Sequence, residues 1–385
     1  MSEDKLRIVF ISTCPEKWGG SEELWCGAAV NLIKEGHRVY VYKTNVDRNH
    51  HRIELLESLG ARVQDIINLR FSVPFRLMNR FLPYPYFYTE HKSRATILIR
   101  QLKMFQPDLV VISQGENFDG MWFAETIRKK GFQYVLISQK AVDFQWILDF
   151  HREVGRNIHQ SALKTYFVSR HNHILTEHQL GVSLPNAEVV HNPFLTKVEK
   201  PIPFPRKEGL HLACVGRLWI LDKGQDILIR VLSQEKWKQR DLFVTFYGEG
   251  FHKEALIDLA KMLEVKNIEF AGHTKDVISI WEKNHALVLP SRSEGLPLVL
   301  VEAMMCGRTA IVTDVGGNSE VLDNGKTGFV ADSPSLKSLD SALEIAWQNK
   351  EKFEEMGMLA AKEIRKIVPA DPAQVFVEKL TNTIN

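Results

Sequence analysis

The segment SEGLPLVLVE places two carboxylates, Glu294 and Glu302, on either side of a glycine, a proline and an apolar run. A carboxylate among apolar residues is costly unless it has a partner. Carboxylates accept hydrogen bonds from hydroxyls, and riboses and sugars carry adjacent hydroxyls. The alternative is a solvated Glu294 in a loop and a Glu302 paired on a helix surface. Whether the two glutamates form a hydroxyl-binding site therefore depends on the chemistry of the residues that surround them.

The residues around Glu294 predict a strand, a loop and a helix. The run HALVLPS (285–291) is strand-like, Pro297 suits the first turn of a helix, and Gly307 suits its end. We expect a helix over 297–306 that starts at the carboxyl end of a strand. The free N–H groups of its first turn would attract an anion.

Two cations in LACVGRLWILDKGQDILI (212–229) could face such an anion. Arg217 lies at the end of a predicted strand and Lys223 at the start of the next helix. Arginine offers a fixed fork to phosphate oxygens, whereas lysine is a mobile point charge. Each alone is typical of a surface charge, but together they predict a phosphate site. The glycine pair in TDVGGNSEVL (313–322) indicates either more backbone donors for that ligand or a tight turn.

A second glycine pair, Gly19 and Gly20, opens a helix after the first apolar run. Its spacing is not GxGxxG, so the dinucleotide fingerprint is absent. The pair would let a substrate approach the backbone, or it forms a common turn.

Short runs rich in Val and Ile alternate with helix-length patterns, which indicates parallel sheets with helices on both faces. The alternation of strand and helix patterns restarts after a proline-rich stretch at 192–209, so we expect two domains of similar size. A cleft between the carboxyl ends of their sheets is also expected. The expected strands are 6–13, 37–44, 108–113, 134–138 and 164–169, then 210–216, 242–248, 268–272, 285–291 and 309–314.

Composition narrows the function classes. Two domains are expected for 385 residues, and a net charge of +2 does not favour nucleic-acid binding. The four cysteines form no CxxC pair, which indicates buried thiols rather than a zinc site or a disulfide framework. No signal peptide or membrane-spanning run is recognisable, so we expect a cytoplasmic protein.

The stretch 70–94 holds many aromatic and basic residues without a regular period. Three readings stay open: aromatic packing, an acceptor-binding loop, or peripheral contact with an anionic membrane surface. The stretch from about Ala370 predicts an amphipathic C-terminal helix that packs on the body of the protein.

These residues together resemble the retaining glycosyltransferases of the GT-B type, in the large group numbered four (glycosyl transferases group 1). The most specific marker is the pair Glu294 and Glu302 separated by seven residues. The resemblance covers nearly the whole chain and also rests on GGSE (19–22), GHRV (36–39), GRL (216–218), DKGQDILI (222–229), YGEG (247–250), FAGHTKDV (270–277), VGGNSEV (315–321) and TGFV (327–330).

The resemblance implies an α/β GT-B fold: two Rossmann-like doubly wound parallel-sheet domains facing each other across a cleft. It implies an acceptor-side domain over 1–200, a donor-side domain over 201–368, and a C-terminal helix over 369–385 that could cross back to the first domain.

The resemblance also implies roles for matching residues. Arg217 and Lys223 would hold the donor diphosphate and stabilise it as it leaves. Glu294 would position the donor sugar, and Glu302 would bind the ribose. The remaining predicted contacts to the nucleotide sugar are Gly19, Gly20, Gly216, Gly272, His273, Gly295, Leu296, Pro297 and Leu298.

The implied reaction moves a sugar from a nucleoside-diphosphate sugar to a hydroxyl of a carbohydrate, lipid-linked or small-molecule acceptor. No DxD metal motif is present, so we expect no metal and no cofactor. One feature departs from the family: where a first-domain histidine is usual, the strand ends carry Gln114 and Gln139. Two alternatives therefore stay open, a non-catalytic nucleotide-sugar-binding scaffold and an epimerase or hydrolase on the same fold.

Overall fold

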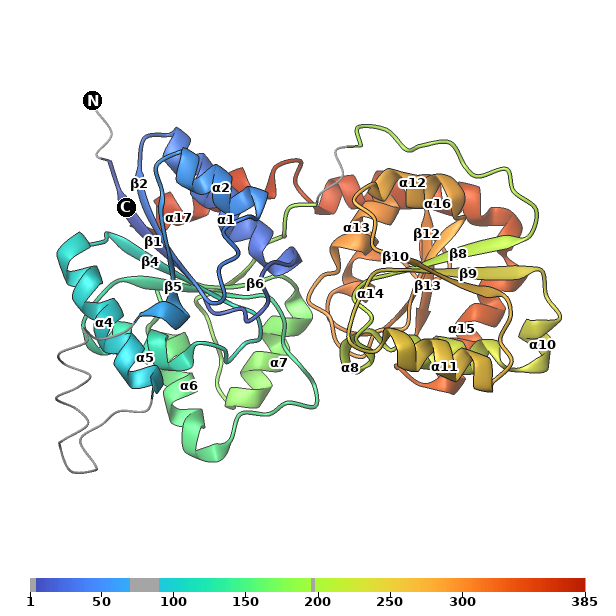
Figure 1. Cartoon of the computed structure of the whole chain (residues 1–385), viewed down its shortest axis with the longest axis horizontal. Helices are drawn as coiled ribbons and strands as arrows, with labels where there is room; N and C mark the ends of the chain where they lie inside the picture. Colours follow the sequence, from blue (N-terminus) through green and yellow to red (C-terminus); the bar gives the residue numbers. More distant parts are fainter. Residues whose placement is uncertain (1–4, 70–89, 195–197, 385) are drawn as a thin grey trace. The chain divides into compact units, whose positions relative to one another are not determined.

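The structure is a computed structural model that describes residues 5–69, 90–194 and 198–384. Contacts divide the chain into two compact units, each built on one parallel sheet. The first unit comprises Met1–Val168, Asn172–Pro193 and Asp371–Asn385, and the second comprises Ser169–His171 and Phe194–Ala370. Figure 1 shows the sheet of each unit between its helices.

The first sheet has the order β3-β2-β1-β4-β5-β6-β7, and all neighbouring strands are parallel. Its central strands are apolar on both faces because helices cover both faces, as expected for a doubly wound sheet. The strands are β1 (Arg7–Ser12), β2 (Arg38–Lys43), β3 (Arg62–Asp65), β4 (Leu109–Gln114), β5 (Tyr134–Ser138), β6 (Thr165–Phe167) and β7 (Ala187–Val189).

Helices α1, α2 and α17 cover one face of the first sheet, and α4, α5 and α6 cover the other. α7 packs beside β6 through a small separate cluster that includes Phe167 and Leu180. The bounds are α1 (Gly20–Lys34), α2 (His51–Ser58), the 3-10 turn η1 (Ile66–Asn68), α4 (Glu90–Phe105), α5 (Met121–Lys129), α6 (Asp149–Ser161), α7 (Arg170–Leu180) and α17 (Pro372–Ile384).

The second sheet has the order β10-β9-β8-β11-β12-β13, again with parallel neighbours. Each of the two sheets therefore starts with its third strand, runs back to its first and then continues with its fourth. The strands are β8 (Leu210–Val215), β9 (Leu242–Tyr247), β10 (Ile268–Gly272), β11 (Ala286–Leu289), β12 (Thr309–Thr313) and β13 (Gly328–Ala331).

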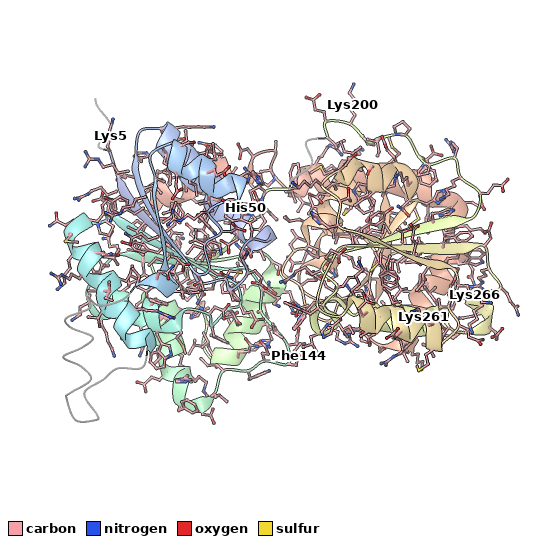
Figure 2. The ribbon with its side chains drawn as sticks, in the orientation of Figure 1. Lys5, His50, Phe144, Lys200, Lys261 and Lys266 are labelled. Atoms are coloured by element: carbon pink, nitrogen blue, oxygen red, sulfur yellow. The ribbon has the colours of Figure 1, made fainter. Side chains whose placement is uncertain are left out.

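One face of the second sheet packs on α9, α10, α11 and α15, and the other on α12, α13, α14 and α16. Apolar side chains fill both layers, whereas lysines such as Lys200 and Lys261 project outward (Figure 2). The bounds are α8 (Ile220–Lys223), α9 (Gln225–Leu232), α10 (Glu235–Lys238), α11 (Lys253–Met262), α12 (Val277–Lys283), α13 (Leu298–Met305), α14 (Asn318–Val321), α15 (Leu336–Gln348), the 3-10 turn η2 (Lys350–Lys352) and α16 (Phe353–Ile367).

The predicted fold class, two doubly wound parallel sheets of the Rossmann type, is confirmed. All ten expected strands occur within one or two residues of the predicted bounds. Sequence analysis missed β3, β7 and β13. β3 (RVQD) and β7 (AEV) each hold a single β-branched residue, and β13 (GFVA) begins at a glycine, so none of the three shows the apolar run of a buried strand.

The C-terminal helix α17 packs on α1 in the first unit. Asn31 Nδ2 donates to Gln374 Oε1 at 2.9 Å, and Phe376 packs edge-on against Tyr166 with a ring separation of 5.1 Å. Of the basic aromatic stretch 70–94, residues 70–89 lie outside the described residues. None of the helices in the described ranges combines the length and apolar character needed to span a bilayer.

Candidate functional site

Three neighbouring strands of the second sheet end in glycine at the carboxyl edge. Gly216 follows β8, Gly248 follows β9, and Gly272 ends β10. The amide of Gly248 donates to Gly272 O at 2.8 Å, and a Cβ on Gly248 would lie 2.0 Å from Gly216 O. These backbones are in direct contact, so a strip without side chains crosses the three strand ends. Such a strip lets a bulky ligand group approach the backbone closely.

Lys223 and Glu294 meet at this edge. Lys223 Nζ lies 2.6 Å from Glu294 Oε1, and Ser291 Oγ donates to the same oxygen at 2.8 Å. The Glu294 side chain is 7% exposed and that of Lys223 is 20% exposed, so this ion pair is largely shielded from water. An ammonium group has three N–H donors. Lys223 can therefore keep Glu294 and still donate to an anion.

The lysine stem follows the end of β8. A Cβ on Gly216 would lie 3.6 Å from Lys223 Cδ and Cε. Burial raises the pKa of the Cys214 thiol to about 12, and the nearby charge of Lys223 partly opposes that shift. Arg217, the residue after Gly216, is exposed at the strand end. The side chain of Lys223 thus passes beside Gly216, the residue that precedes Arg217 at this strand end.

The loop that carries Glu294 is fastened to the loop that carries Lys223. Arg292 forms a two-point ion pair with Asp226 at 2.6 and 2.9 Å, and its Nη1 also donates to Ile220 O at 2.7 Å. The amides of Arg292 and Ser293 both donate to Asp222 O. Planar two-point pairs fix geometry as well as charge. The Lys223–Glu294 pair is therefore held by its supporting loops.

Two glycines allow these loops to approach closely. Gly224, with φ of +60°, ends α8, and a Cβ there would lie 2.0 Å from Pro290 O. Gly316, with φ of +55°, lies after β12, and a Cβ there would lie 2.3 Å from Glu294 O. Gly317 N also donates to Gly295 O at 2.6 Å. The VGGN loop thus packs on the backbone of the Glu294 loop.

Helix α13 begins at Leu298 with Pro297 as its N-cap, close to the predicted 297–306. The first amides of a helix have no acceptor inside the helix. They therefore carry the positive end of the helix dipole at this edge. Glu302 is on the same helix and is 4% exposed. Gly295 and Leu296 form the short link between Glu294 and Pro297.

The other predicted contacts are placed as follows. Gly272 adopts a φ of +76°, and a Cβ there would lie 3.1 Å from Glu249 Oε1. His273 follows it and is exposed. Both lie at the β10 end of the glycine strip. The opposite end of the strip lies at Gly216, beside Lys223.

Gly19 and Gly20 lie in the first unit, where Gly19 is the N-cap of α1. The neighbouring Glu22 is fully buried and accepts from Ser12 Oγ at 2.9 Å and Trp25 Nε1 at 2.6 Å. Burial raises the pKa of the Glu22 carboxyl, and the charge of Lys43 opposes that shift. Glu22 therefore ties the helix start to the end of β1, a role that the GGSE pattern alone does not reveal.

Gln114 and Gln139 lie at the carboxyl edge of the first sheet, as their positions after two strands predict. Gln114 Nε2 donates to Asp119 O at 2.7 Å, and Asn192 Nδ2 donates to Gln139 Oε1 at 2.7 Å. Both glutamines are buried. In the described part of the chain, Gln114 Oε1 and Gln139 Nε2 have no hydrogen-bond partner.

The structure thus places Gly216, Lys223, Glu294 and Gly295 in one connected loop cluster. Sequence reasoning missed Ser291, Arg292 and Asp226, which hold that cluster. One signal for them is present in the sequence. Ser291 and Arg292 lie two or three residues before Glu294, and Asp226 lies in the DKGQDILI motif that also contains Lys223. Within the described ranges, no three His, Cys, Asp or Glu side chains converge on a point where they could hold a metal ion.

Comparison with known proteins agrees with this picture. Residues 197–363 match the family described as Glycosyl transferases group 1. The matched residues lie within the second unit of the chain, Phe194–Ala370, apart from its short segment at 169–171.

Two curated relatives are similar over part of the chain. An uncharacterized glycosyltransferase of Haemophilus influenzae is 29% identical over 151 residues, 39% of this chain and 42% of the relative. A D-inositol 3-phosphate glycosyltransferase of Paenarthrobacter aurescens is 26% identical over 191 residues, 48% of this chain and 47% of the relative. The chain thus matches less than half the length of each.

A solved structure extends the likeness to both units. Anabaena Alr3699/HepE in complex with UDP superposes with a TM-score of 0.75 at 16% identity, covering 98% of this chain and 100% of that one. At this identity the likeness concerns the fold, which is that of GT-B glycosyltransferases.

Proposed function

We propose that this protein is a glycosyltransferase that moves a sugar from a nucleoside-diphosphate sugar to an acceptor hydroxyl. The observation that carries the proposal is the Lys223–Glu294 pair, which lies beside the Arg217 strand end and one short link before the α13 start. A cation, a carboxylate and a helix N-terminus are the groups that a sugar diphosphate needs.

The roles follow from the charge that develops during transfer. The bond from the anomeric carbon to the diphosphate oxygen breaks, and a bond to the acceptor oxygen forms. The acceptor proton passes to the leaving diphosphate. Arg217, Lys223 and the first amides of α13 would stabilise the negative charge on that diphosphate, since fixed donors aimed at developing charge are often the largest catalytic contribution.

Glu294 is proposed as a positioning group for the donor sugar. Its Oε1 already accepts from Lys223 and Ser291, so it is held in place rather than presented as a nucleophile. Glu302 is proposed to bind the ribose hydroxyls, with Gly272 and His273 near the base. Gly19 and Gly20 keep their proposed role as close backbone contacts to substrate.

Three finer points belong to the same proposal. Transfer would retain configuration and involve a hexose, as in the group that the sequence resembles. The cations would replace a metal ion at the diphosphate. The acceptor would be a carbohydrate, a lipid-linked glycan or a small molecule, and the name of the Paenarthrobacter relative supports a phosphorylated polyol among the candidates.

A panel of nucleotide sugars tests the proposal. The full chain is incubated with each donor, with and without a mixture of acceptors, and released nucleoside diphosphate and glycosylated products are measured. We expect release that depends on an acceptor, and an Arg217→Ala variant should lower it by about 100-fold or more. Lys261→Ala is a matched control, because Lys261 is 73% exposed on α11.

Two outcomes would contradict the proposed transfer reaction, and a third would contradict the role of Arg217. Donor binding without release, with every acceptor tried, would favour a nucleotide-sugar-binding scaffold. Turnover that needs no acceptor would favour a hydrolase or an epimerase. Unchanged turnover in Arg217→Ala would show that Arg217 does not stabilise the leaving diphosphate.

A further inference from the structure

One face of the first sheet is polar at its β3 edge. Strand residues alternate between faces, and residues in register on neighbouring strands share a face. Arg7 pairs in register with Arg38 on β2, and Tyr40, two residues further along β2, pairs with Arg62 on β3. The three arginines and Tyr40 therefore point from the same face of three adjacent strands.

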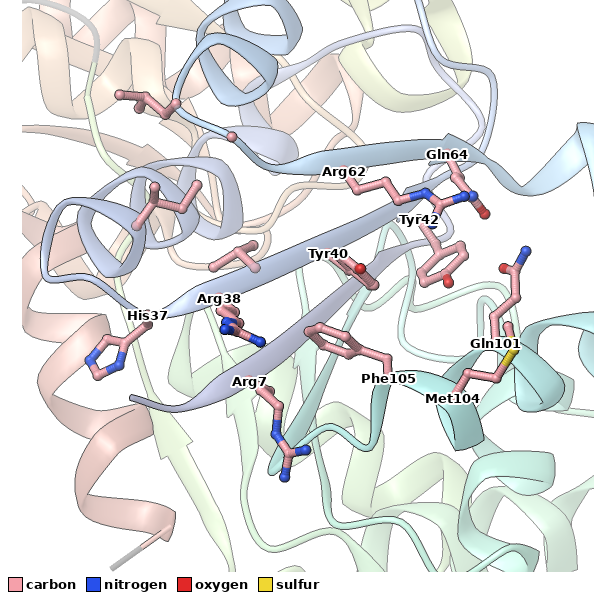
Figure 3. Close-up of a pocket in the computed structure, with 14 residues that line it drawn as sticks. Arg7, His37, Arg38, Tyr40, Tyr42, Arg62, Gln64, Gln101, Met104 and Phe105 are labelled. Atoms are coloured by element: carbon pink, nitrogen blue, oxygen red, sulfur yellow. The ribbon is translucent and has the colours of Figure 1, made fainter. Parts of the chain in front are cut away.

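This face borders a hollow of about 700 Å³. Its floor is formed by β1 to β3, and the last turn of α4 forms one wall through Gln101, Met104 and Phe105 (Figure 3). Phe105 stacks on Tyr40 with ring centroids 3.8 Å apart. Among the described residues, α4 and α5 cover the same face of the sheet toward β4, and the edge strands β2 and β3 border the hollow.

The charges around the hollow are unbalanced. Its described lining includes Arg7, Arg38, Arg62 and His37 but no Asp or Glu. Asp108 pairs with Arg7 at 3.1 Å from outside the lining. Arg62 lies 5.9 Å from the centre of the Tyr40 ring.

Two of these guanidinium groups have no carboxylate partner. In the ranges that the structure describes, Arg38 and Arg62 are exposed and neither forms an ion pair. Like charges on neighbouring strands destabilise a sheet unless a counter-charge is present. A bound anion would supply that counter-charge.

We propose that this hollow is an anion-binding site for a phosphate-bearing ligand. Arg38 and Arg62 would bind the phosphate oxygens, since guanidinium groups match phosphate geometry. The stacked rings of Tyr40 and Phe105 would contact the uncharged remainder of the ligand. The phosphate group could belong to a soluble phosphate ester or to the headgroup of an anionic lipid, and the same residues would bind either.

The site is separate from the residues proposed for catalysis. Arg7, Arg38 and Arg62 are the first residues of their strands. The proposed substrate contacts of this unit follow the opposite, carboxyl end of β1, roughly 20 Å further along a six-residue strand. Binding in the hollow is therefore proposed as a docking or regulatory event, and it does not rest on the proposed transfer reaction.

The test uses the full chain with an Arg217→Ala background, which weakens the proposed donor site. Binding is measured with inorganic pyrophosphate by calorimetry and with phosphatidylglycerol vesicles by sedimentation, with phosphatidylcholine vesicles as the neutral control. An Arg38→Gln/Arg62→Gln double variant is compared with Arg152→Gln on α6. Both sets of arginines are at least partly exposed, and thermal denaturation checks the fold of each variant.

We expect binding of at least one probe to weaken tenfold or more in the double variant and to stay unchanged in Arg152→Gln. Saturable pyrophosphate binding that needs both arginines identifies a soluble ligand. Binding only to phosphatidylglycerol vesicles identifies a lipid headgroup. If neither probe binds, or if binding is the same in the double variant, the proposal is wrong. Transfer activity with intact Arg217 is measured separately, so a failure of the proposed function is distinguishable.

Discussion

The two sheets have the same strand order but different chemistry at their carboxyl edges. In the second sheet, the strand ends of β8 and β11 are followed by Lys223 and Glu294, an ion pair with a separation of 2.6 Å. In the first sheet, β1, which corresponds to β8, is followed by the buried carboxyl of Glu22, whereas β4, which corresponds to β11, and its neighbour β5 end in neutral groups. Gln114 and Ser138 are fully buried, and Gln139 is 5% exposed.

This difference suggests that the two units bind different substrates. A charged edge suits a diphosphate, whose oxygens need cations and helix amides. The neutral amides at the ends of β4 and β5 suit hydroxyls, because an amide offers both donors and acceptors without the desolvation cost of a charge. We infer that the second unit binds the donor and that Gln139 contributes to acceptor recognition. The same topology supports both functions because the site residues lie on loops.

The largest effect is expected from Lys223→Ala. Loss of the ammonium group removes a donor to the leaving diphosphate, so kcat should fall by about 100- to 1,000-fold. Steady-state kinetics with the identified donor measures this change. Thermal denaturation checks the fold, because the variant also leaves the Glu294 carboxylate buried without its cation. A kcat equal to that of Lys261→Ala would mean that the charged edge is structural only.

Asp119, in the loop after β4, is a partly buried carboxyl whose titration tests how far this part of the first edge disfavours charge. Burial raises the pKa of Asp119 from 3.8 to about 6, and the charges of Glu116 and Glu16 add to the shift. Between these two values the folded protein binds a proton that the unfolded chain has lost. The free energy of unfolding should therefore fall as pH rises through this window, by up to about 3 kcal/mol.

Asp119→Asn should remove that pH dependence and should be more stable than the natural protein at pH 7. Urea denaturation at pH 4.5 and pH 7.5 compares the two proteins. Asp149→Asn is the control, because Asp149 is 87% exposed. Parallel stability profiles for Asp119→Asn and the natural protein would show that Asp119 is ionised in the folded state.

Glu302→Ala should mainly weaken donor binding. A hydrogen bond to a charged group contributes roughly 1.5 to 3 kcal/mol, so the donor Kd should rise about 10- to 100-fold. Calorimetry with the identified nucleotide sugar measures the change. Glu351→Ala, at a side chain that is 87% exposed, should leave the affinity unchanged. Equal affinities in the two variants would argue against ribose binding by Glu302.

The smallest effect is expected from Gln139→Leu. Loss of one neutral hydrogen bond costs about 1 kcal/mol, so the acceptor KM should rise about fivefold. The donor KM should not change, because the donor is assigned to the other edge. Kinetics with each substrate varied in turn separate the two constants. A rise in the donor KM alone would indicate that Gln139 contacts the donor and not the acceptor.

The exposed arginines of the first sheet show where sequence patterns stop being informative. Arg38, Tyr40 and Tyr42 alternate with Val39 and Val41, which predicts a strand with one polar and one apolar face. The pattern does not reveal that Arg7 and Arg62 lie on that same face. Register between strands decides this, and the missed strand β3 contains Arg62.

The sequence by itself determined the order of ten strands, the α13 start behind Pro297, and the presence of two cations and two carboxylates near strand ends. These features follow from local patterns, because period and capping depend on residues that are neighbours in the chain. Only the tertiary structure decided that Lys223 binds Glu294, 71 residues away, and that Arg292 and Asp226 hold both loops. Such pairs form between loops that the parallel sheet brings to one edge, and side-chain pairing over that separation leaves no periodic trace in the sequence.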